Sequence, residues 1–517
     1  MSGDGRFASW RSLKPSVMDV SGPARDMVFL YGFVIDGRLD ADKLKQAWQQ
    51  LCQTWPILSA RFRQGANSKS PQDWHYLLPP DAEVQAVVEA DMSDSCPAGR
   101  RSLVVDEIES KGRDFHPFVE GRDLPQDRPT LHHAAWVRDT RPKTRSKLLL
   151  NFASNAPLTV DHLFTEDRPV ATAKITRFAD ATTIGLALPH VLCDGLGAEL
   201  VVRAWAALAN GEGEHIKPLP GLGQDPFAAL APGGKVAQEE MDAAEAAGHE
   251  ELPPPAGWHA YSVLQTALFL AHYMWDVIWA RPEATMEQRE LFLPKAYLDE
   301  QKAAAMAEIK SKPSAGDDDY VSTSDICIAI ALKRMCAPDA RGPDDARLFS
   351  FVHPANLRYM DGAAQSVALP KPYLHNAIHA VALADIPIGK LVYGLSVGEL
   401  ALELRRALQR ESKPEAIRRS LVWCLANVDK FIAFFRPSSF WVGGTNWRSM
   451  KLHDVSFAKA LETSSAATGR PFKIYMQAIS RIPMRNMMVI VGDDATGGIW
   501  VNMTLSASQW RRIEQAD

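Results

Sequence analysis

The chain has 517 residues, 46% of them hydrophobic and 23% charged, a composition typical of a globular protein long enough for two domains. Its formal net charge is −5 and no basic stripe occurs, so nucleic acid is not an expected partner. Six cysteines without CxxC spacing predict a reducing compartment, with neither a disulfide scaffold nor a zinc knuckle. The N-terminal residues lack the apolar segment of a secretory signal, so we expect a cytoplasmic protein.

The first 210 residues alternate between predicted strands and helices. A strand and a turn are expected over 27–40. Apolar residues at helical spacing over 41–55 then predict a helix that ends before Pro56. Further strands are expected over 73–78, 147–154, 169–180 and 182–191, with a hairpin turn at 179–182 and a helix over 195–209.

A segment of different composition, 211–258, separates the two halves. It is rich in Gly, Pro, Ala and Glu, and we interpret it as a long connector. The next apolar stretch, VLQTALFLAHYMWDVIWA at 263–280, is nearly as long as a membrane span, but Gln265, His272 and Asp276 interrupt it. We therefore expect a buried or amphipathic helix there, with contact at a membrane surface as the less favoured alternative.

The second half also mixes strands with helices, and no repeat of fixed period occurs. Helices are expected over 295–310, 322–335, 394–410 and 506–515, and strands over 348–357, 376–386, 439–447, 471–479, 487–494 and 497–505. This alternation predicts a mixed α/β fold of two lobes. We place an N-terminal lobe at 1–210, a crossover linker at 211–260 and a C-terminal lobe at 261–517.

The stretch PHVLCDGLG, 189–197, carries the candidate chemistry. His190 closes a buried strand, and Asp194 and Gly195 follow four and five residues later. A neutral imidazole at a strand end can face a crevice and take a proton from a hydroxyl or an amine. The alternative is a satisfied buried histidine followed by Asp194 as the N-cap of a helix. Asp194 can also be structural while His190 is functional.

Other familiar sites are missing from the sequence, which contains no GxSxG, P-loop or GxGxxG motif. HNAIH, 375–379, places two histidines four residues apart. It lacks the glutamate of HExxH, and in a strand-like run these histidines would lie about 13 Å apart. We expect neither of them to bind a metal.

Several stretches in order resemble one family. PHVLCDG resembles the HxxxDG signature of the CoA-dependent acyltransferases called BAHD, whose superfamily includes chloramphenicol acetyltransferase and peptide-synthetase condensation domains. The latter two usually have a second histidine where Pro189 stands, which favours BAHD. The family's N-terminal strand resembles LKPSVMDVSGP, and its pilxgRf region resembles LDADKLKQAWQQLCQTWPILSARFR. Its ST-x-D helix resembles STSDICIAIALKRM. Its Gly-Asn strand resembles HNAIHA, in which His375 replaces the glycine. The pattern is similar to fungal members that serve secondary metabolism.

The resemblance implies a fold, an activity and residue roles. It implies two chloramphenicol-acetyltransferase-like lobes with an active-site tunnel between them, acyl-CoA as a co-substrate without a permanent cofactor, and a monomer. The activity would be acyl transfer to a hydroxyl or amine of a small metabolite. His190 would be the general base, and the Thr445 hydroxyl and Trp447 indole would face the oxyanion. Asp194 and Gly195 would shape the loop.

One block departs from the family pattern. TNWRSMKLHDVSFAKA, beginning at Thr445, resembles a block that ends in DFGWG, but only Phe457 of Ser456–Ala460 matches that box. In the family the box is mainly structural and lies near the donor side, so this departure bears on whether CoA is used. Two other hypotheses therefore stay open: CoA-independent cyclisation or condensation that uses His190, and a non-catalytic ligand-binding protein.

Overall fold

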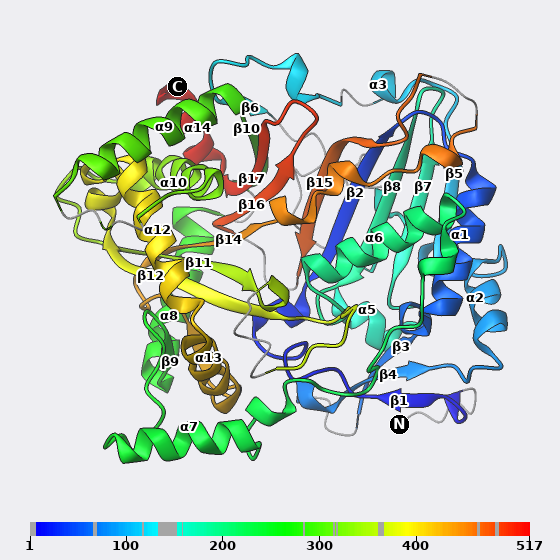
Figure 1. The fold of residues 1–517 in the computed structure, drawn as a ribbon, viewed down its shortest axis with the longest axis horizontal. Helices are drawn as coiled ribbons and strands as arrows, with labels where there is room; N and C mark the ends of the chain where they lie inside the picture. The colour runs from blue at the N-terminus through cyan, green and yellow to red at the C-terminus, as the bar shows by residue number, and fades with distance from the viewer. Residues whose placement is uncertain are drawn as a thin grey trace.

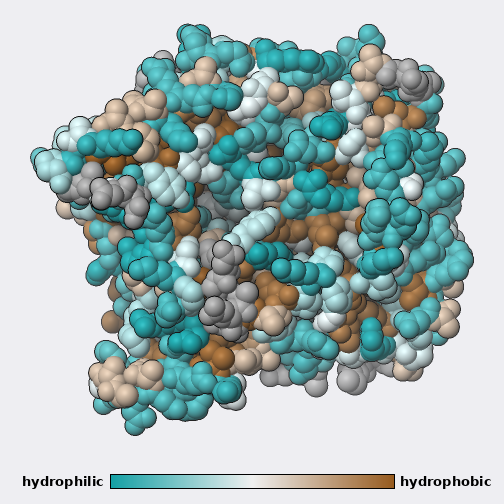
Figure 2. Space-filling model, viewed as in Figure 1, coloured by the Kyte–Doolittle hydropathy of each residue, from teal (hydrophilic) through white to brown (hydrophobic). Residues whose placement is uncertain are grey.

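Two mixed β-sheets, each packed against helices, form the two lobes of the computed structural model (Figure 1). The structure describes residues 7–65, 70–115, 118–132, 152–157, 159–282, 285–313, 316, 319–359, 367–462, 466–480 and 485–516. The face seen in Figure 2 is mostly hydrophilic, with hydrophobic residues visible toward its middle. The mixed α/β fold predicted from the sequence is confirmed.

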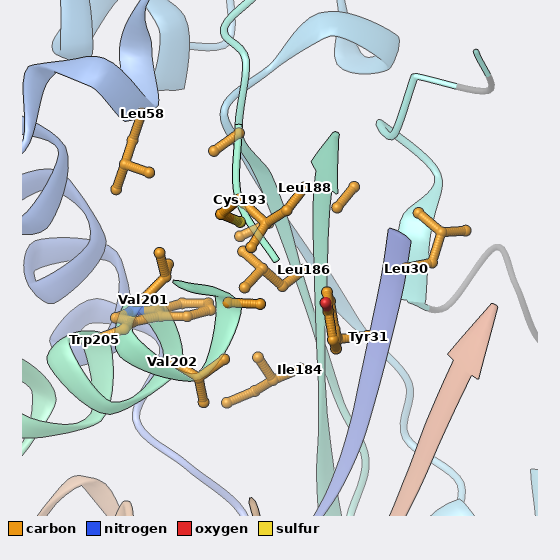
Figure 3. Packing of buried hydrophobic residues seen from close by; sticks show 14 of the residues in the cluster. Leu30, Tyr31, Leu58, Ile184, Leu186, Leu188, Cys193, Val201, Val202 and Trp205 are labelled. Carbon is orange, nitrogen blue, oxygen red and sulfur yellow. The ribbon is translucent and has the colours of Figure 1, made fainter. Parts of the chain in front are cut away.

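The N-terminal lobe contains a five-stranded sheet of order β15-β2-β8-β7-β5. Its strands are β2 (Val28–Asp36), β5 (Leu103–Glu107), β7 (Thr172–Arg177), β8 (Ala181–Pro189) and β15 (Pro471–Ile479). Helices α1 (Ala41–Thr54) and α6 (Gly195–Ala209) pack on each other through Trp48 and Trp205, whose ring centroids lie 4.9 Å apart. Figure 3 shows side chains of α6 meeting those of β8 in this core.

The C-terminal lobe contains a seven-stranded sheet of order β12-β11-β14-β16-β17-β10-β6. Its strands are β6 (Thr130–His132), β10 (Met286–Leu293), β11 (Leu348–Asn356), β12 (Ile378–Pro387), β14 (Phe440–Asn446), β16 (Met487–Asp493) and β17 (Ile499–Ser506). A second hydrophobic core joins this sheet to helices α9 (Lys295–Ser311), α10 (Thr323–Cys336), α12 (Val397–Glu411) and α14 (Ala507–Ala516). Ser322 caps α10 in a reciprocal capping box with Asp325.

Each large sheet includes one strand from the other half of the sequence. Strand β15 pairs antiparallel with β2 over its length, and in Figure 1 it lies beside the N-terminal strands. Strand β6 pairs antiparallel with β10 in the C-terminal lobe. The lobes are therefore joined by strand exchange as well as by the segment 211–258.

Shorter strands and further helices lie outside the two large sheets and their main helices. They are the strands β1 (Arg11–Leu13), β3 (Arg61–Gln64), β4 (Trp74–Leu78), β9 (His259–Tyr261) and β13 (Phe431–Ala433), and the helices α2 (Val84–Met92), α3 (Gly112–Phe115), α5 (Val160–Thr165), α7 (Lys235–Ala246), α8 (Val263–Trp275) and α13 (Pro414–Ala426). The connector is thus partly structured, because α7 lies within it and Phe227 and Leu230 enter a hydrophobic cluster with α13.

Most predicted elements are confirmed, including the hairpin between β7 and β8 and the helix that Asp194 precedes. The strand expected over 147–154 lies outside the described residues, except for 152–154, where Phe152 and Ala153 are helical. For 263–280 the sequence predicted a buried or amphipathic helix; a helix forms there, but the buried alternative is wrong. Helix α8 contains no buried residue, because it lies at the edge of the lobe and only part of one face meets the protein.

Candidate active site

The loop that follows β8 begins at the centre of the molecule with His190. The His190 backbone N–H donates to the Met27 carbonyl (2.8 Å), which extends the β2–β8 ladder by one step. The imidazole lies against the Phe29 ring, with centroids 5.0 Å apart, and keeps part of its surface exposed. The strand end therefore fixes where the imidazole stands without enclosing it completely.

Asp194 closes the same loop and is almost fully buried. Its Oδ1 accepts from the Gly197 N–H (3.0 Å), which makes it the N-cap of α6. Its Oδ2 lies 2.7 Å from Arg358 Nη1 and accepts from the Ala377 N–H at 2.9 Å. Both partners belong to the C-terminal half, so this carboxylate fastens the loop across the two lobes.

A close approach of backbones explains one glycine of the motif. A Cβ added at Gly197 would lie 2.0 Å from the Leu374 carbonyl oxygen, which no side chain tolerates. At Gly195, an added Cβ would lie 3.2 Å from Trp447 Nε1 and 3.3 Å from the Met450 sulfur. The small residues thus let the first turn of α6 approach the C-terminal lobe.

Three consecutive residues of the C-terminal half hold the loop from outside. His375 Nδ1 lies 3.0 Å from the Leu192 carbonyl oxygen, and Asn376 Nδ2 donates to the His190 carbonyl at 2.8 Å. Ala377 is the next residue, and its N–H contacts Asp194 as described above. From the sequence we expected HNAIHA to form a strand and predicted none of these contacts. Each contact joins residues more than 180 positions apart, which no local pattern can indicate.

Asp19 anchors this arrangement and was also missed. It is buried, accepts from the backbone and side-chain nitrogens of Asn376 (3.0 and 2.7 Å), and lies 3.4 Å from His375 Nδ1. Burial raises the pKa of Asp19 from 3.8 to about 6, although His375 and the hydrogen bonds oppose this shift. A possible sequence signal was the resemblance of LKPSVMDVSGP, which contains Asp19, to the family's first strand.

Trp447, just beyond the end of β14, meets the N-terminal lobe, and Thr445 lies in that strand. The buried Trp447 indole stacks on Tyr31 (5.2 Å, 27°) and meets Phe29 edge-on at 6.1 Å. Phe29 therefore touches both His190 and Trp447. Thr445, partly exposed, stands two residues earlier, within β14. Among the described residues, neither the indole N–H nor the threonine hydroxyl has a hydrogen-bond partner.

The electrostatic surroundings keep His190 uncharged. Burial lowers its pKa below 6.5, while a hydrogen bond to its own backbone and the charge of Asp194 act in the opposite direction. Burial also raises the pKa of the adjacent Cys193 thiol well above its usual range, so no thiolate nucleophile forms there. The site therefore combines a neutral imidazole with an indole N–H that has no hydrogen-bond partner among the described residues, and Phe29 touches both rings.

The segment Ser456–Ala460 lies apart from this cluster and supports α6 and α1. Phe457 is buried and meets the Trp205 ring edge-on at 6.4 Å. Asn210 Nδ2 donates to the Ser456 carbonyl (2.7 Å), and the Asp40 N–H donates to the Ala460 carbonyl (2.7 Å). Backbone contacts and the Phe457 ring hold this segment, and the Lys459 ammonium adds an ion pair with Glu212 at 2.8 Å.

The two histidines of HNAIH do not lie together in a metal-binding arrangement. His375 faces Asp19 and Leu192, whereas His379 is buried in β12, where burial lowers its pKa to about 4. In the described part of the chain, no group of three or more His, Cys, Asp or Glu side chains could hold a metal ion.

Comparison with known proteins gives relationships over nearly the full length. The chain is 26% identical to acetyltransferase MATC1 of Mycosarcoma maydis, over 97% of this chain and 95% of that protein. TRI101 of F. graminearum complexed with ethyl coenzyme A has the same fold, with a TM-score of 0.60 at 13% identity over 98% and 97% of the chains. Vinorine synthase follows with a TM-score of 0.53 at 14% identity over 97% and 91%. No protein-family model matches the chain.

The chain is similar to acetyltransferases over nearly its full length and shares the fold of TRI101, and it is therefore an acyltransferase. The relative named above, MATC1, is an acetyltransferase of a fungus, and the fold is shared with TRI101 and vinorine synthase, in agreement with the resemblance found in the order of motifs.

Proposed function

We propose that this protein transfers an acyl group from an acyl-CoA to a hydroxyl or amine of a small secondary metabolite, with His190 as general base. The observation that carries the proposal is His190, a half-buried residue whose imidazole has a lowered pKa and packs on Phe29, the ring that also meets Trp447. Relatives named acetyltransferases and a TRI101 structure with ethyl coenzyme A support the donor class.

The proton follows a short route. Neutral His190 takes a proton from the acceptor as the acceptor oxygen or nitrogen attacks the thioester carbonyl, and it returns the proton to the leaving thiolate. The Trp447 N–H and the Thr445 hydroxyl donate to the oxygen of the tetrahedral intermediate. One such donor is worth about 3–4 kcal/mol when water is excluded. Asp194, engaged by Arg358 and Ala377, keeps the loop in place.

The donor has a polar cleft available near this site. A cleft of about 770 Å³ opens beside the segment after Trp447 and is lined by residues from both lobes, among them five basic residues, including Lys451 and Arg470, and six acidic ones, including Asp36. Lys451 and Arg470 are exposed and have no acidic partner within the described residues. We assign them to the phosphates of acyl-CoA, because cations on a cleft wall bind phosphate by charge-assisted hydrogen bonds.

The test is release of free thiol when the full chain is incubated with short acyl-CoAs and a panel of alcohols and amines. Thiol release that requires both substrates, with an acylated product by mass spectrometry, is the expected result. Product formed without CoA would instead favour cyclisation or condensation. Binding of acceptor with no turnover of any donor would favour a non-catalytic protein.

A paired variant tests the donor assignment. Lys451→Ala combined with Arg470→Ala should raise the KM for acyl-CoA about tenfold while kcat stays within a factor of two or so. Lys43→Ala combined with Arg11→Ala, which removes two cations outside the cleft, is the matched control. An unchanged KM for acyl-CoA in the first variant would remove the assignment.

A further inference from the structure

Helix α8 and the π-helical turn after it, Asp276–Ala280, present two adjacent rows of apolar side chains to solvent. The rows follow from spacings of three and four residues, and every member is exposed. They are Val263, Ala267, Leu270, Met274 and Ile278 in one row, and Leu264, Leu268, Ala271, Trp275 and Trp279 in the other. The exposed fraction is 69% for Leu264 and 62% for Trp279. We call this surface the α8 ridge.

The opposite face of α8 attaches the ridge to the protein. Phe269 packs on Phe431 and Phe435, at centroid distances of 5.0 and 5.4 Å. Asp276, the one charged side chain in 263–280, pairs with Arg281 through both carboxylate oxygens at 2.7 Å. Figure 1 shows α8 at the edge of the C-terminal lobe, beside β9 and α13. The helix is therefore apolar toward the protein, where Phe269 packs, and also toward solvent, where a helix that covers a core would present polar side chains.

Size argues against a second copy of the chain as the occupant. Eighteen helical residues span about 27 Å, so a ridge about 10 Å wide has a footprint of about 270 Å². A stable interface between two proteins buries about 800 Å² on each side. A pair of ridges falls well short of that area. The ridge is also convex, and such a contact would lack the polar rim of ordinary protein interfaces.

The chemistry of the ridge fits a lipid surface. Neither row contains a charged or hydrogen-bonding side chain other than two indoles, so its burial in acyl chains leaves no polar group unpaired. Trp275 and Trp279 stand together at one end, 5.1 Å between ring centroids, and tryptophan favours the headgroup level of a bilayer. No helix in the described ranges is long and apolar enough to cross a membrane.

We propose that the α8 ridge lies flat in the interface of a lipid bilayer and makes the enzyme peripheral to a membrane. The attachment is hydrophobic, since the ridge carries no charge, and it is independent of the acyl-transfer proposal. His272 and Gln265, exposed at the edge of the ridge, remain at headgroup level.

The experiment is co-flotation of the full chain with phosphatidylcholine vesicles, with and without phosphatidylserine, at low and high salt. Wild type should float with both kinds of vesicle at either salt concentration, because hydrophobic insertion is not screened. Leu268→Glu and Trp279→Glu should each lower the bound-to-free ratio at least about tenfold, since a carboxylate in the acyl region is costly. Tyr393→Glu, at an exposed aromatic outside α8, is the matched control and should float as wild type.

Several outcomes would overturn the proposal. They are wild type that stays with the soluble fraction, ridge variants that float as well as wild type, and binding that needs phosphatidylserine and vanishes in salt. A dimer in size-exclusion chromatography that Leu268→Glu dissociates would instead assign the ridge to self-association. Unchanged melting temperatures of the variants show that they fold, which the exposure of both positions predicts.

Discussion

His190 and His375 stand at the same loop, yet their surroundings differ. His375 Nδ1 lies 3.0 Å from the Leu192 carbonyl and 3.4 Å from the Asp19 carboxylate, so protein groups occupy that nitrogen. The carboxylate nearest to His190 in sequence, Asp194, is instead taken by Arg358, and the His190 ring lies against Phe29. His375 therefore holds the loop, and His190 is the imidazole that we propose as the base.

This difference motivates the proposal of His375 as a positioning residue and His190 as the base. A base needs a neutral ring with room for a partner, whereas a positioning group needs its hydrogen bonds made inside the protein. Substitutions at these and neighbouring residues test this difference.

The largest effect is expected at His190. His190→Gln should lower kcat/KM by about 10²–10⁴, the usual contribution of a positioned base. His375→Gln should stay within about tenfold of wild type, because its amide can still donate to the Leu192 carbonyl. Steady-state kinetics of both variants measures the contrast. Equal losses, or a larger loss at His375, would reverse the two roles.

The next effect concerns the ion pair that ties the loop to the other lobe. Arg358→Met should lower the free energy of unfolding by about 3–5 kcal/mol, because it leaves the buried Asp194 carboxylate without its cation. Arg436→Met breaks an exposed pair with Asp385 and should cost at most about 1 kcal/mol. Denaturant unfolding compares them, and similar losses would contradict the bridging role of Asp194.

A smaller effect is expected at the proposed oxyanion donor. Trp447→Phe keeps a ring to stack on Tyr31 but removes the N–H, so kcat should fall about 10²–10³ with little change in KM. Trp441→Phe, on the same strand, should leave kcat unchanged. If the two variants had equal activity, the indole N–H would have no part in the reaction.

The smallest effect is a difference in pH dependence. Burial raises the pKa of Asp19 to about 6 in the folded protein, against an ordinary value of 3.8, so between these pH values the folded state binds more protons. Stability from this group is therefore present below pH 3.8 and is lost as the pH rises toward 6. Across that window wild type should lose about 3 kcal/mol relative to Asp19→Asn. Parallel stability curves from denaturant titrations would show that Asp19 is not the group responsible.

Much of the fold could be predicted because its signals are local. The apolar run of 182–191 and the helical pattern after Gly195 predicted β8 and α6, and Asp194 was expected as a helix cap. The sequence could not show that Asp194 also meets Arg358, 164 residues away, or that β15 joins the N-terminal sheet. Nor could it show the direction of the apolar side of α8, because periodicity gives the face of a helix but not what covers it.

By itself, the sequence determined the strand–loop–helix unit that carries His190, since neighbouring residues settle strands, caps and helices. Only the tertiary structure decided that Asp19, Arg358 and Asn376 hold this loop and that Trp447 reaches it. These contacts join segments more than 150 residues apart, and no local pattern encodes which buried polar groups will meet.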